Sequence, residues 1–266
     1  MRARLIKAVM KGGREAALLR LIYQLIAPFW QPWRTYRALT SVPWFLGSLW
    51  RYRASSRERV PLLDLYPNLN DRFASAGAAS GHYFHQDLWA ARKVFRSGRK
   101  CHVDVGSRVD GFVAHCATFA TVEFVDLRPM ASDTEGIEWR QGDILKLPFA
   151  SESIESLSSL HVVEHIGLGR YGDPINPDGT RLALSELQRV LAVGGHLYLG
   201  LPIGRARVCF NAHRIFKPSS ILDLLPELKL VSFSAVDDAG VFVASPSLKD
   251  FDEANYACGL FHLTRP

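Results

Sequence analysis

The sequence predicts an α/β protein built on a doubly wound, mostly parallel sheet with helices on both faces. Short segments rich in β-branched and apolar residues alternate along the chain with segments in which apolar residues have helical spacing. Such alternation is typical of parallel sheets, in which a crossover helix joins each strand to the next. Seven strands are expected, over residues 101–105, 121–125, 137–140, 154–160, 196–201, 229–235 and 258–264.

Turn signals set the limits of several elements. Gly106 ends the first strand, and apolar residues with helical spacing follow over residues 112–119. An amphipathic helix is expected over 181–191, with Gly194–Gly195 as its left-handed cap. Another helix, over 84–96, leads into the first strand. The last two strands are expected to form a hairpin at the edge of the sheet.

Charge is distributed unevenly along the 266 residues. Residues 1–60 hold 12 Lys and Arg against 2 Asp and Glu, a net charge of +10, which leaves −4 for the rest of a chain whose formal charge is +6. The length and the 48% apolar content fit one sizeable core. We therefore expect a basic, aromatic-rich helical extension over residues 1–60 and one α/β domain over residues 61–266.

The extension has the composition of a membrane-interface segment. Its apolar run, residues 16–30, is interrupted by Arg20 and broken at Pro28; a bilayer span needs about 20 apolar residues, and a signal-peptide cleavage site is missing. Lys and Arg interleaved with aromatic rings suit the headgroup region, so residues 1–53 are expected to bind an anionic membrane surface. The alternative is a helical cap with buried aromatic side chains. No RNA-binding motif accompanies the basic residues, and no nucleic-acid partner is expected. The extension contains four of the six tryptophans, Trp30, Trp33, Trp44 and Trp50.

The cysteines indicate a reducing compartment. Cys101, Cys116, Cys209 and Cys258 stand alone, without a C-x-x-C pair. This pattern argues against a disulfide framework and against a zinc ribbon. We expect a cytoplasmic protein, peripheral at the inner face of a membrane if the extension binds lipid.

The ends of the first two strands carry the candidate ligand-binding residues. Asp126 follows Gly106 by 20 residues, about the spacing at which a carboxylate meets ribose hydroxyls at the tip of the neighbouring strand. The segment from Gly106 to Gly111 does not fit G-x-G-x-x-G. A nicotinamide cofactor is therefore disfavoured, because its pyrophosphate requires the second glycine.

Motifs along the chain resemble those of a known superfamily. The order Asp104-x-Gly106, then Asp126, then Gly142-Asp143-Ile144 with Leu147-Pro148-Phe149, resembles the class I S-adenosylmethionine-dependent methyltransferases. The resemblance continues through residues 158–165 and 186–195 and covers roughly residues 82–264.

Three further segments narrow the resemblance. Residues 66–72, 82–89 and 211–214 look similar to a branch of that superfamily with no assigned chemistry. The resemblance implies a Rossmann-like fold of the class I methyltransferase type and S-adenosyl-L-methionine as cofactor.

The resemblance also implies roles for individual residues. Asp126 would hold the ribose and Asp143 the adenine amine, between apolar walls from Leu127 and Ile144. Asp104 would orient the methionine amino group or neighbouring backbone, or else cap the following helix. The implied cofactor-binding set is Asp104, Gly106, Ser107, Arg108, Asp126, Leu127, Asp143, Ile144, Leu160 and His161.

The glycine turn departs from the superfamily pattern. After the acid, the superfamily shows the rhythm acid-x-Gly-x-Gly-x-Gly, but here the second and third glycine positions hold Arg108 and Asp110, and Gly111 comes one place late. Arg108 could reach the methionine carboxylate or fill the site. A fold that no longer binds the cofactor therefore remains open.

The segment His161-Val-Val-Glu164-His165 has the H-x-x-E-H order of some zinc peptidases. Zinc would require both imidazoles on one helical face. A strand leads directly into His161 and Gly167 follows soon after His165, so that helix is missing and no metal is expected. His165 is either a general base or a residue that orders the loop.

A long loop and a later polar segment are expected to face the acceptor. Residues 167–179 are rich in glycine and proline and follow the fourth strand. The candidates on the acceptor side are Arg170, Tyr171 and Asp173 in this loop, Asn211 and Arg214 further on, and His213 as a second candidate base; each of them could instead have a structural role.

Together these features predict methyl transfer from S-adenosylmethionine to a small polar or glycan-like acceptor, through an oxygen atom. The alternative is a catalytically silent, methyltransferase-like binding module attached to a membrane surface.

Overall fold

The computed structural model describes residues 32–74, 77, 79–131 and 133–266. The chain divides into two compact units, Met1–Gly77 and Ala78–Pro266. The boundary predicted at residue 60 lies within the first unit. Part of the predicted extension, residues 1–31, lies outside the described residues.

In the described part of the first unit, the long helix α3 (Pro32–Ser55) is followed by the short turns η1 (Leu62–Asp64) and η2 (Asp71–Phe73). None of the helices in the described part of the chain is long and apolar enough to cross a membrane.

Aromatic side chains on α3 are exposed. Trp33 and Trp44 are 41% exposed and Trp50 is 72% exposed. Guanidinium groups lie over two of these rings, Arg37 at 5.2 Å from the Trp33 centroid and Arg72 at 4.8 Å from the Trp44 centroid. Arginines from α3 and from η2 thus lie on aromatic faces of α3, which places basic groups beside exposed apolar rings.

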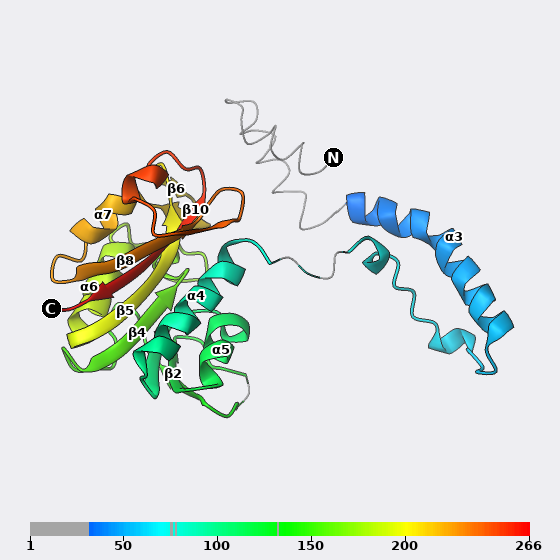
Figure 1. Cartoon of the computed structure of the whole chain (residues 1–266), viewed down its shortest axis with the longest axis horizontal. Helices are drawn as coiled ribbons and strands as arrows, with labels where there is room; N and C mark the ends of the chain where they lie inside the picture. Colours follow the sequence, from blue (N-terminus) through cyan, green and yellow to red (C-terminus); the bar gives the residue numbers. More distant parts are fainter. Residues whose placement is uncertain (1–31, 75–76, 78, 132) are drawn as a thin grey trace. The chain divides into compact units, whose positions relative to one another are not determined.

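The second unit is built on an eight-stranded sheet with the order β3-β2-β1-β4-β5-β10-β8-β9 (Figure 1). Strands β1 to β5 are parallel to one another. The predicted fold class is therefore confirmed, with eight strands instead of seven. The strands are β1 (Cys101–Val105), β2 (Thr121–Asp126), β3 (Ile137–Gln141), β4 (Ile154–Leu160), β5 (Leu191–Ile203), β8 (Lys229–Val236), β9 (Phe242–Ala244) and β10 (Ala257–Thr264).

The last two predicted strands pair as expected, but they do not form the edge of the sheet. β10 lies between β5 and β8 and is antiparallel to both, so the predicted pairing is confirmed and the predicted edge position is wrong. Most of β10 is buried, as expected of a strand with a neighbour on each side. The edge is formed by β9, whose three residues are too few to show a periodic pattern.

Helices cover both faces of the sheet (Figure 1). α4 (His82–Ser97) and α5 (Ala114–Ala117) pack into one apolar cluster with Phe124 and Tyr198. α6 (Gly179–Val190) and α7 (Pro218–Asp223) pack on the opposite face. The sheet is thus buried on both sides, as parallel sheets require.

The segment Gly194–Gly195 does not cap a helix, contrary to the prediction. α6 ends at Val190 and β5 begins at the next residue, with both glycines inside the strand. Pairing with β4 shifts register here, and Gly194 has a φ of +72°. The two glycines therefore form a bulge, an alternative use of a glycine with positive φ.

The helix predicted over residues 112–119 is replaced by two shorter pieces. A π-helical turn, η3 (Val109–Val113), precedes α5. A Cβ on Gly111 would lie 2.2 Å from Asp87 Oδ2 on α4, so glycine at this position lets the turn approach α4. The displaced glycine of the motif therefore has a packing role.

The predicted loop over residues 202–214 contains regular structure. β5 continues to Ile203, and a small two-stranded sheet follows, formed by β6 (Arg207–Cys209) and β7 (His213–Ile215).

A buried polar network ties β1 to β4. The two ring nitrogens of His102 lie 2.8 Å from the hydroxyls of Ser156 and Ser158, and Ser158 donates to Asp104 Oδ1 at 2.5 Å. All four side chains are buried. Burial lowers the pKa of His102 to about 3, so the ring is neutral, and the set joins two strands away from solvent.

Replacing His102 by Asn should make the free energy of unfolding less dependent on pH in acid. The folded chain favours the neutral ring, while the unfolded chain protonates near pH 6.5. The stabilisation is therefore complete above pH 6.5 and is lost as the pH falls toward about 3. Within that window the free energy of unfolding of the wild type should fall more steeply than that of the variant, by about 1.4 kcal/mol per pH unit.

Urea unfolding at about pH 7.5 and about pH 5 measures this difference. Equal slopes for the two proteins would contradict the neutral, buried assignment of His102.

Candidate functional site

A cavity of about 390 Å³ opens in the second unit where strands β1, β2 and β4 end. This edge is where open α/β sheets bind ligands. Five residues of the predicted cofactor-binding set line the cavity, namely Gly106, Asp126, Leu127, Ile144 and His161.

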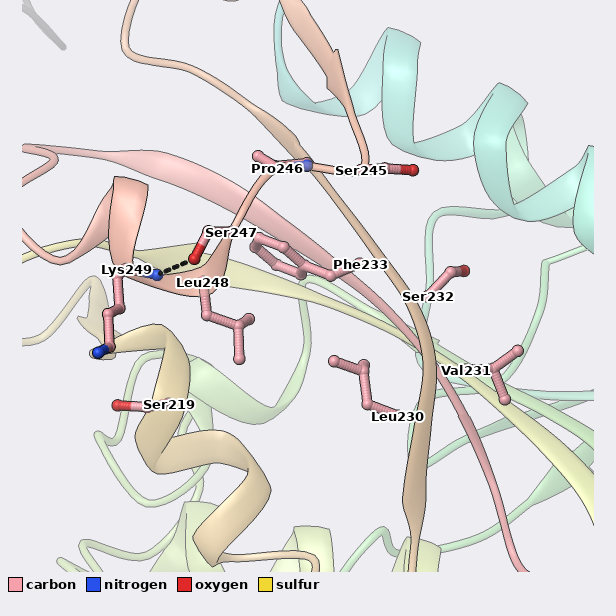
Figure 2. Close-up of a pocket in the computed structure, with 10 residues that line it drawn as sticks. All are labelled: Ser219, Leu230, Val231, Ser232, Phe233, Ser245, Pro246, Ser247, Leu248 and Lys249. Atoms are coloured by element: carbon pink, nitrogen blue, oxygen red, sulfur yellow. Dashed lines mark hydrogen bonds between the residues drawn. The ribbon is translucent and has the colours of Figure 1, made fainter.

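A larger cavity of about 540 Å³ lies elsewhere in the second unit (Figure 2). Residues of β8, the segment after β9 and α7 form its wall, and Lys249 is the one charged residue in that lining. None of the predicted site residues lines it. Its lining offers no convergent set of charged or titratable groups, so the cavity at the strand ends is the candidate site.

The turn after β1 requires glycine. Gly106 has a φ of +73°, and a Cβ on it would lie 3.0 Å from Val162 Cγ1. Its N–H donates to Val125 O at 2.9 Å. The turn is thereby held against the end of β2, and backbone instead of a side chain faces the cavity.

Asp104 and Ser107 lie beneath this turn. Asp104 is fully buried and accepts hydrogen bonds from the Ser107 N–H at 3.0 Å and the Ser107 hydroxyl at 2.6 Å. Leu160 N–H donates to the Ser107 hydroxyl oxygen at 3.0 Å. Asp104, Ser107 and Leu160 support the turn from below and do not line the cavity.

Asp126 stands at the tip of β2, and Arg128 covers it. The Arg128 side chain donates from Nε to Oδ1 at 3.0 Å and from Nη2 to Oδ2 at 2.9 Å, and its backbone N–H donates to Oδ1 at 2.8 Å. Asp126 is 10% exposed and Arg128 66% exposed. Arg128 also lies 5.2 Å from the centroid of Tyr171. The oxygens expected to hold a ribose therefore have a partner within the chain.

Arg128 is a charged residue of the cavity that the sequence analysis did not predict. The sequence feature that could have identified it is its position two residues after an acid that ends a strand. From this position the guanidinium can reach back to the acid. The arginine that was singled out, Arg108, lies away from the cavity, where it pairs with Asp110 at 2.9 Å and lies over the Tyr83 ring. Arg108 therefore neither fills the cavity nor lines it.

Asp143 lies beside the cavity and does not line it. Its Oδ1 accepts from the Leu145 N–H at 2.9 Å. Its two neighbours, Gly142 and Ile144, are in the lining. The predicted contact of Asp143 with adenine stays a prediction.

The segment after β4 forms a buried cluster. His161 follows the strand with a φ of +56°, a conformation that costs a non-glycine residue about 1–3 kcal/mol and is common at functional sites. Its Nδ1 lies 2.6 Å from Glu164 Oε1. Glu164 is fully buried, on the short turn η4 (Val163–His165). Burial alone would lower the pKa of His161, but Cys258 and Glu164 raise it well above its ordinary value.

The two candidate bases differ in position. His165 lines the cavity, while His213 does not. His165 Nδ1 lies 2.6 Å from Ala212 O, which requires a proton on Nδ1. Burial lowers the pKa of His165, so the ring is neutral with an unprotonated Nε2, and this nitrogen lies 3.3 Å from Arg170 Nη1. His213 is half-buried and lies 4.9 Å from the Tyr256 ring.

The loop over residues 167–179 is held by two charged side chains. Asp173 accepts from the N–H groups of Gly167, Gly169 and Tyr171 at 2.9, 3.3 and 3.2 Å. Arg214, on β7, donates to Ile166 O at 2.7 Å and to two carbonyls of the loop. These residues shape the cavity wall by fixing the backbone.

The remaining predicted acceptor-side residues divide into two groups. Tyr171 and Asp173 line the cavity. Arg170 donates to Ala212 O at 3.0 Å and lies against His165, and Asn211 is exposed between β6 and β7; neither lines the cavity.

Comparison with known families gives a match over part of the chain. Residues 146–256 match the model of DUF268, described as a Caenorhabditis protein of unknown function. No curated protein matches the chain in sequence.

Comparison with solved structures establishes the fold. The N-methyltransferase NodS from Bradyrhizobium japonicum WM9, in complex with S-adenosyl-L-homocysteine, is 18% identical over 70% of this chain and 89% of its own, with a TM-score of 0.50. The [4+2]-cyclase SpnF is 12% identical over 68% of this chain and 80% of its own, with a TM-score of 0.52. The chain therefore has the class I methyltransferase fold. One of these relatives is a methyltransferase and the other a cyclase, so the fold leaves the reaction open.

Replacing Arg214 by Gln should loosen the loop over residues 167–179. The variant loses charge-assisted hydrogen bonds to carbonyls, worth about 1.5 kcal/mol, which corresponds to about tenfold more frequent local opening. Trypsin should then cut after Arg170 about tenfold faster than in the wild type. The control is Arg181→Gln, which removes an exposed arginine paired with Asp178. Equal rates of cleavage in both variants would contradict the role of Arg214.

Proposed function

We propose that the second unit binds S-adenosylmethionine in the cavity at the strand ends and transfers its methyl group to an acceptor. The observation that carries the proposal is the pairing of the Gly106 turn with the carboxylate of Asp126 in one cavity of the class I methyltransferase fold. Leu127 and Ile144 offer apolar walls for an adenine ring beside that carboxylate. The complex of NodS with S-adenosyl-L-homocysteine supports the choice of cofactor.

Binding would require Arg128 to leave Asp126. Both carboxylate oxygens accept from this guanidinium in the ligand-free chain, so the ribose hydroxyls must replace it. The guanidinium is mostly exposed and can turn into solvent, and an ion pair of this kind contributes about 0–1 kcal/mol. Arg128 thus lowers the affinity for the cofactor without abolishing binding.

The reaction we propose is transfer to an oxygen of a small polar or glycan-like acceptor. The polar loop over residues 167–179 bounds the cavity, and polar acceptors suit such a wall. His165 is the favoured general base, because it lines the cavity and keeps an unprotonated nitrogen. Positioning of acceptor oxygen, methyl carbon and sulfur in line would supply much of the rate.

The alternative is a catalytically silent module of the same fold. Arg108 and Asp110 occupy positions where the superfamily has glycine, and Arg128 occupies the carboxylate of Asp126. A silent module would bind the cofactor too weakly to measure, or bind it without turnover.

Calorimetry with S-adenosyl-L-homocysteine tests the proposal. The wild type should bind, Asp126→Asn should bind about 10–100-fold more weakly because charge-assisted hydrogen bonds are lost, and Arg128→Gln should bind up to about fivefold more tightly because a competing ion pair is removed.

The matched control is Arg108→Gln, which changes an arginine outside the cavity and should leave the affinity unchanged. Absence of binding to the wild type at millimolar ligand would contradict the proposal and favour the silent module.

We also propose that the first unit binds an anionic membrane surface, which would make the protein peripheral at the cytoplasmic face of a membrane. The observation in favour is the set of exposed tryptophans on α3, with basic residues beside them. Trp and Arg together suit the headgroup region, where rings lie among lipid carbonyls and guanidinium groups meet phosphates.

Liposome flotation of the full chain tests this second proposal. The wild type should float with vesicles that contain phosphatidylserine, and the triple variant Trp33→Ala, Trp44→Ala, Trp50→Ala should not. Phe95→Ala removes an exposed aromatic side chain from the second unit and should float like the wild type. Flotation of the triple variant equal to that of the wild type would refute the assignment.

A further inference from the structure

Three potential metal ligands from distant parts of the chain meet beside the candidate site. A ring nitrogen of His82, a ring nitrogen of His161 and the Sγ of Cys258 lie within 4.8 Å of one another. His82 begins α4, His161 follows β4 and Cys258 lies on β10. Zinc bonds of about 2.0–2.3 Å in a tetrahedron place ligand atoms about 3.5 Å apart. The two imidazole rings are stacked, with their centroids 5.4 Å apart and their planes at 4°, so one ring must turn for both nitrogens to face a common ion.

Hydrogen bonds leave one free nitrogen on each imidazole. His161 Nδ1 is bound to Glu164 Oε1 at 2.6 Å, and its Nε2 is buried without a hydrogen-bond partner. His82 Nε2 lies 3.2 Å from Tyr256 O, and a nitrogen that donates to a carbonyl leaves the lone pair on the other nitrogen. Metal-binding histidines have this arrangement, in which a carboxylate or carbonyl fixes the tautomer of the ring.

The buried acidic groups of the cluster would also suit a cation. Glu164 is fully buried, and its Oε2 has no partner. Cys258 is buried, its Sγ makes long contacts of 3.8 Å to Gln86 Oε1 and 3.8 Å to Gly259 O, and it also interacts with His161. A divalent ion would balance one thiolate in its coordination sphere and one carboxylate behind His161. Two neutral imidazoles and one thiolate are ligands that zinc prefers.

We propose that His82, His161 and Cys258 form a zinc site, with Glu164 as the carboxylate that orients His161. Glu164 lies between two histidines of the H-x-x-E-H segment, but only His161 of that pair belongs to the site, and the other two ligands come from α4 and β10. The segment alone was expected to bind no metal, and the site arises from the fold.

Three protein ligands leave a fourth position, as in catalytic zinc sites. His161 also lines the candidate cavity, so the fourth position would be close to it. An oxygen or sulfur bound there would have its pKa lowered by the ion. This role in activating an acceptor rests on the proposed function, whereas the metal site itself does not.

Metal analysis of the full-length, untagged chain tests the site. After treatment with a chelator and addition of zinc, the wild type should retain about one zinc per chain, as expected for one site of this kind. The cobalt-substituted protein should show a thiolate-to-cobalt charge-transfer band, because Cys258 supplies sulfur. Glu164→Gln should weaken zinc binding by about 10–100-fold, the usual effect of losing a carboxylate behind a histidine ligand.

Matched variants separate ligands from other buried residues. Cys258→Ser and His161→Gln should each weaken zinc binding more than Glu164→Gln does. Cys116→Ser and His262→Gln alter a buried cysteine and a partly buried histidine outside the cluster and should bind zinc like the wild type. Circular dichroism identifies any variant that fails to fold, and the cobalt spectrum of the wild type decides the matter if one does.

A wild type without stoichiometric zinc, a cobalt spectrum without the thiolate band, or equal zinc affinity in Cys258→Ser and Cys116→Ser would overturn the proposal and leave a His161–Glu164 pair only. These measurements involve no nucleoside ligand. A chain that binds zinc but not S-adenosyl-L-homocysteine would refute the proposed function alone, and the reverse result would refute the metal site alone.

Discussion

The buried carboxylate of Asp104 is the interaction on which the candidate site depends. It receives the hydroxyl of Ser158 from β4 and two hydrogen bonds from Ser107 in the turn after β1. An unsatisfied carboxylate in this position would be costly, so the three donors must converge, and their convergence fixes the turn relative to β4. The backbone of Gly106 therefore faces the cavity, and it lies between the end of β2 and the segment that begins at His161. Asp104 thus shapes the site without lining it.

Arg128 shows how a charged site is stabilised before its ligand arrives. Asp126 is nearly buried at the tip of β2, and a carboxylate there requires hydrogen-bond donors. In the ligand-free chain the donors are the backbone and guanidinium of Arg128. Ribose hydroxyls would supply equivalent donors. The need of this carboxylate for donors therefore explains its ion pair with Arg128. It also explains why ribose hydroxyls could replace the guanidinium, which is exposed and can turn into solvent.

Local patterns in the sequence were sufficient to predict the parallel half of the sheet. β1 and β4 were predicted with their observed limits, and β2 and β3 to within a residue, because each is a short segment with β-favouring apolar residues that is followed by a polar turn. Patterns failed where tertiary pairing decides the outcome. Gly194 lies in a β-bulge because the pairing of β4 with β5 changes register there. The position of β10 inside the sheet depends on its two neighbours. Five predicted cofactor-binding residues line the cavity. Others, such as Asp104, lie beneath the turn, and their spacing in the sequence does not distinguish them from the residues that line the cavity.

The cluster around Cys258 is the part of the molecule least accessible from sequence, because it depends on the order of strands. His161 N–H donates to Gly200 O on β5 at 2.7 Å, and Cys258 pairs with Pro202 two residues further along the same strand. β5 therefore brings together the end of β4 and the start of β10. If β8 instead of β10 were the neighbour of β5, Cys258 would lie away from His161. The position of β10 next to β5 thus brings the Cys258 thiol close to His161, whose Nδ1 is bound to Glu164. It would in this way supply the third ligand of the proposed zinc site.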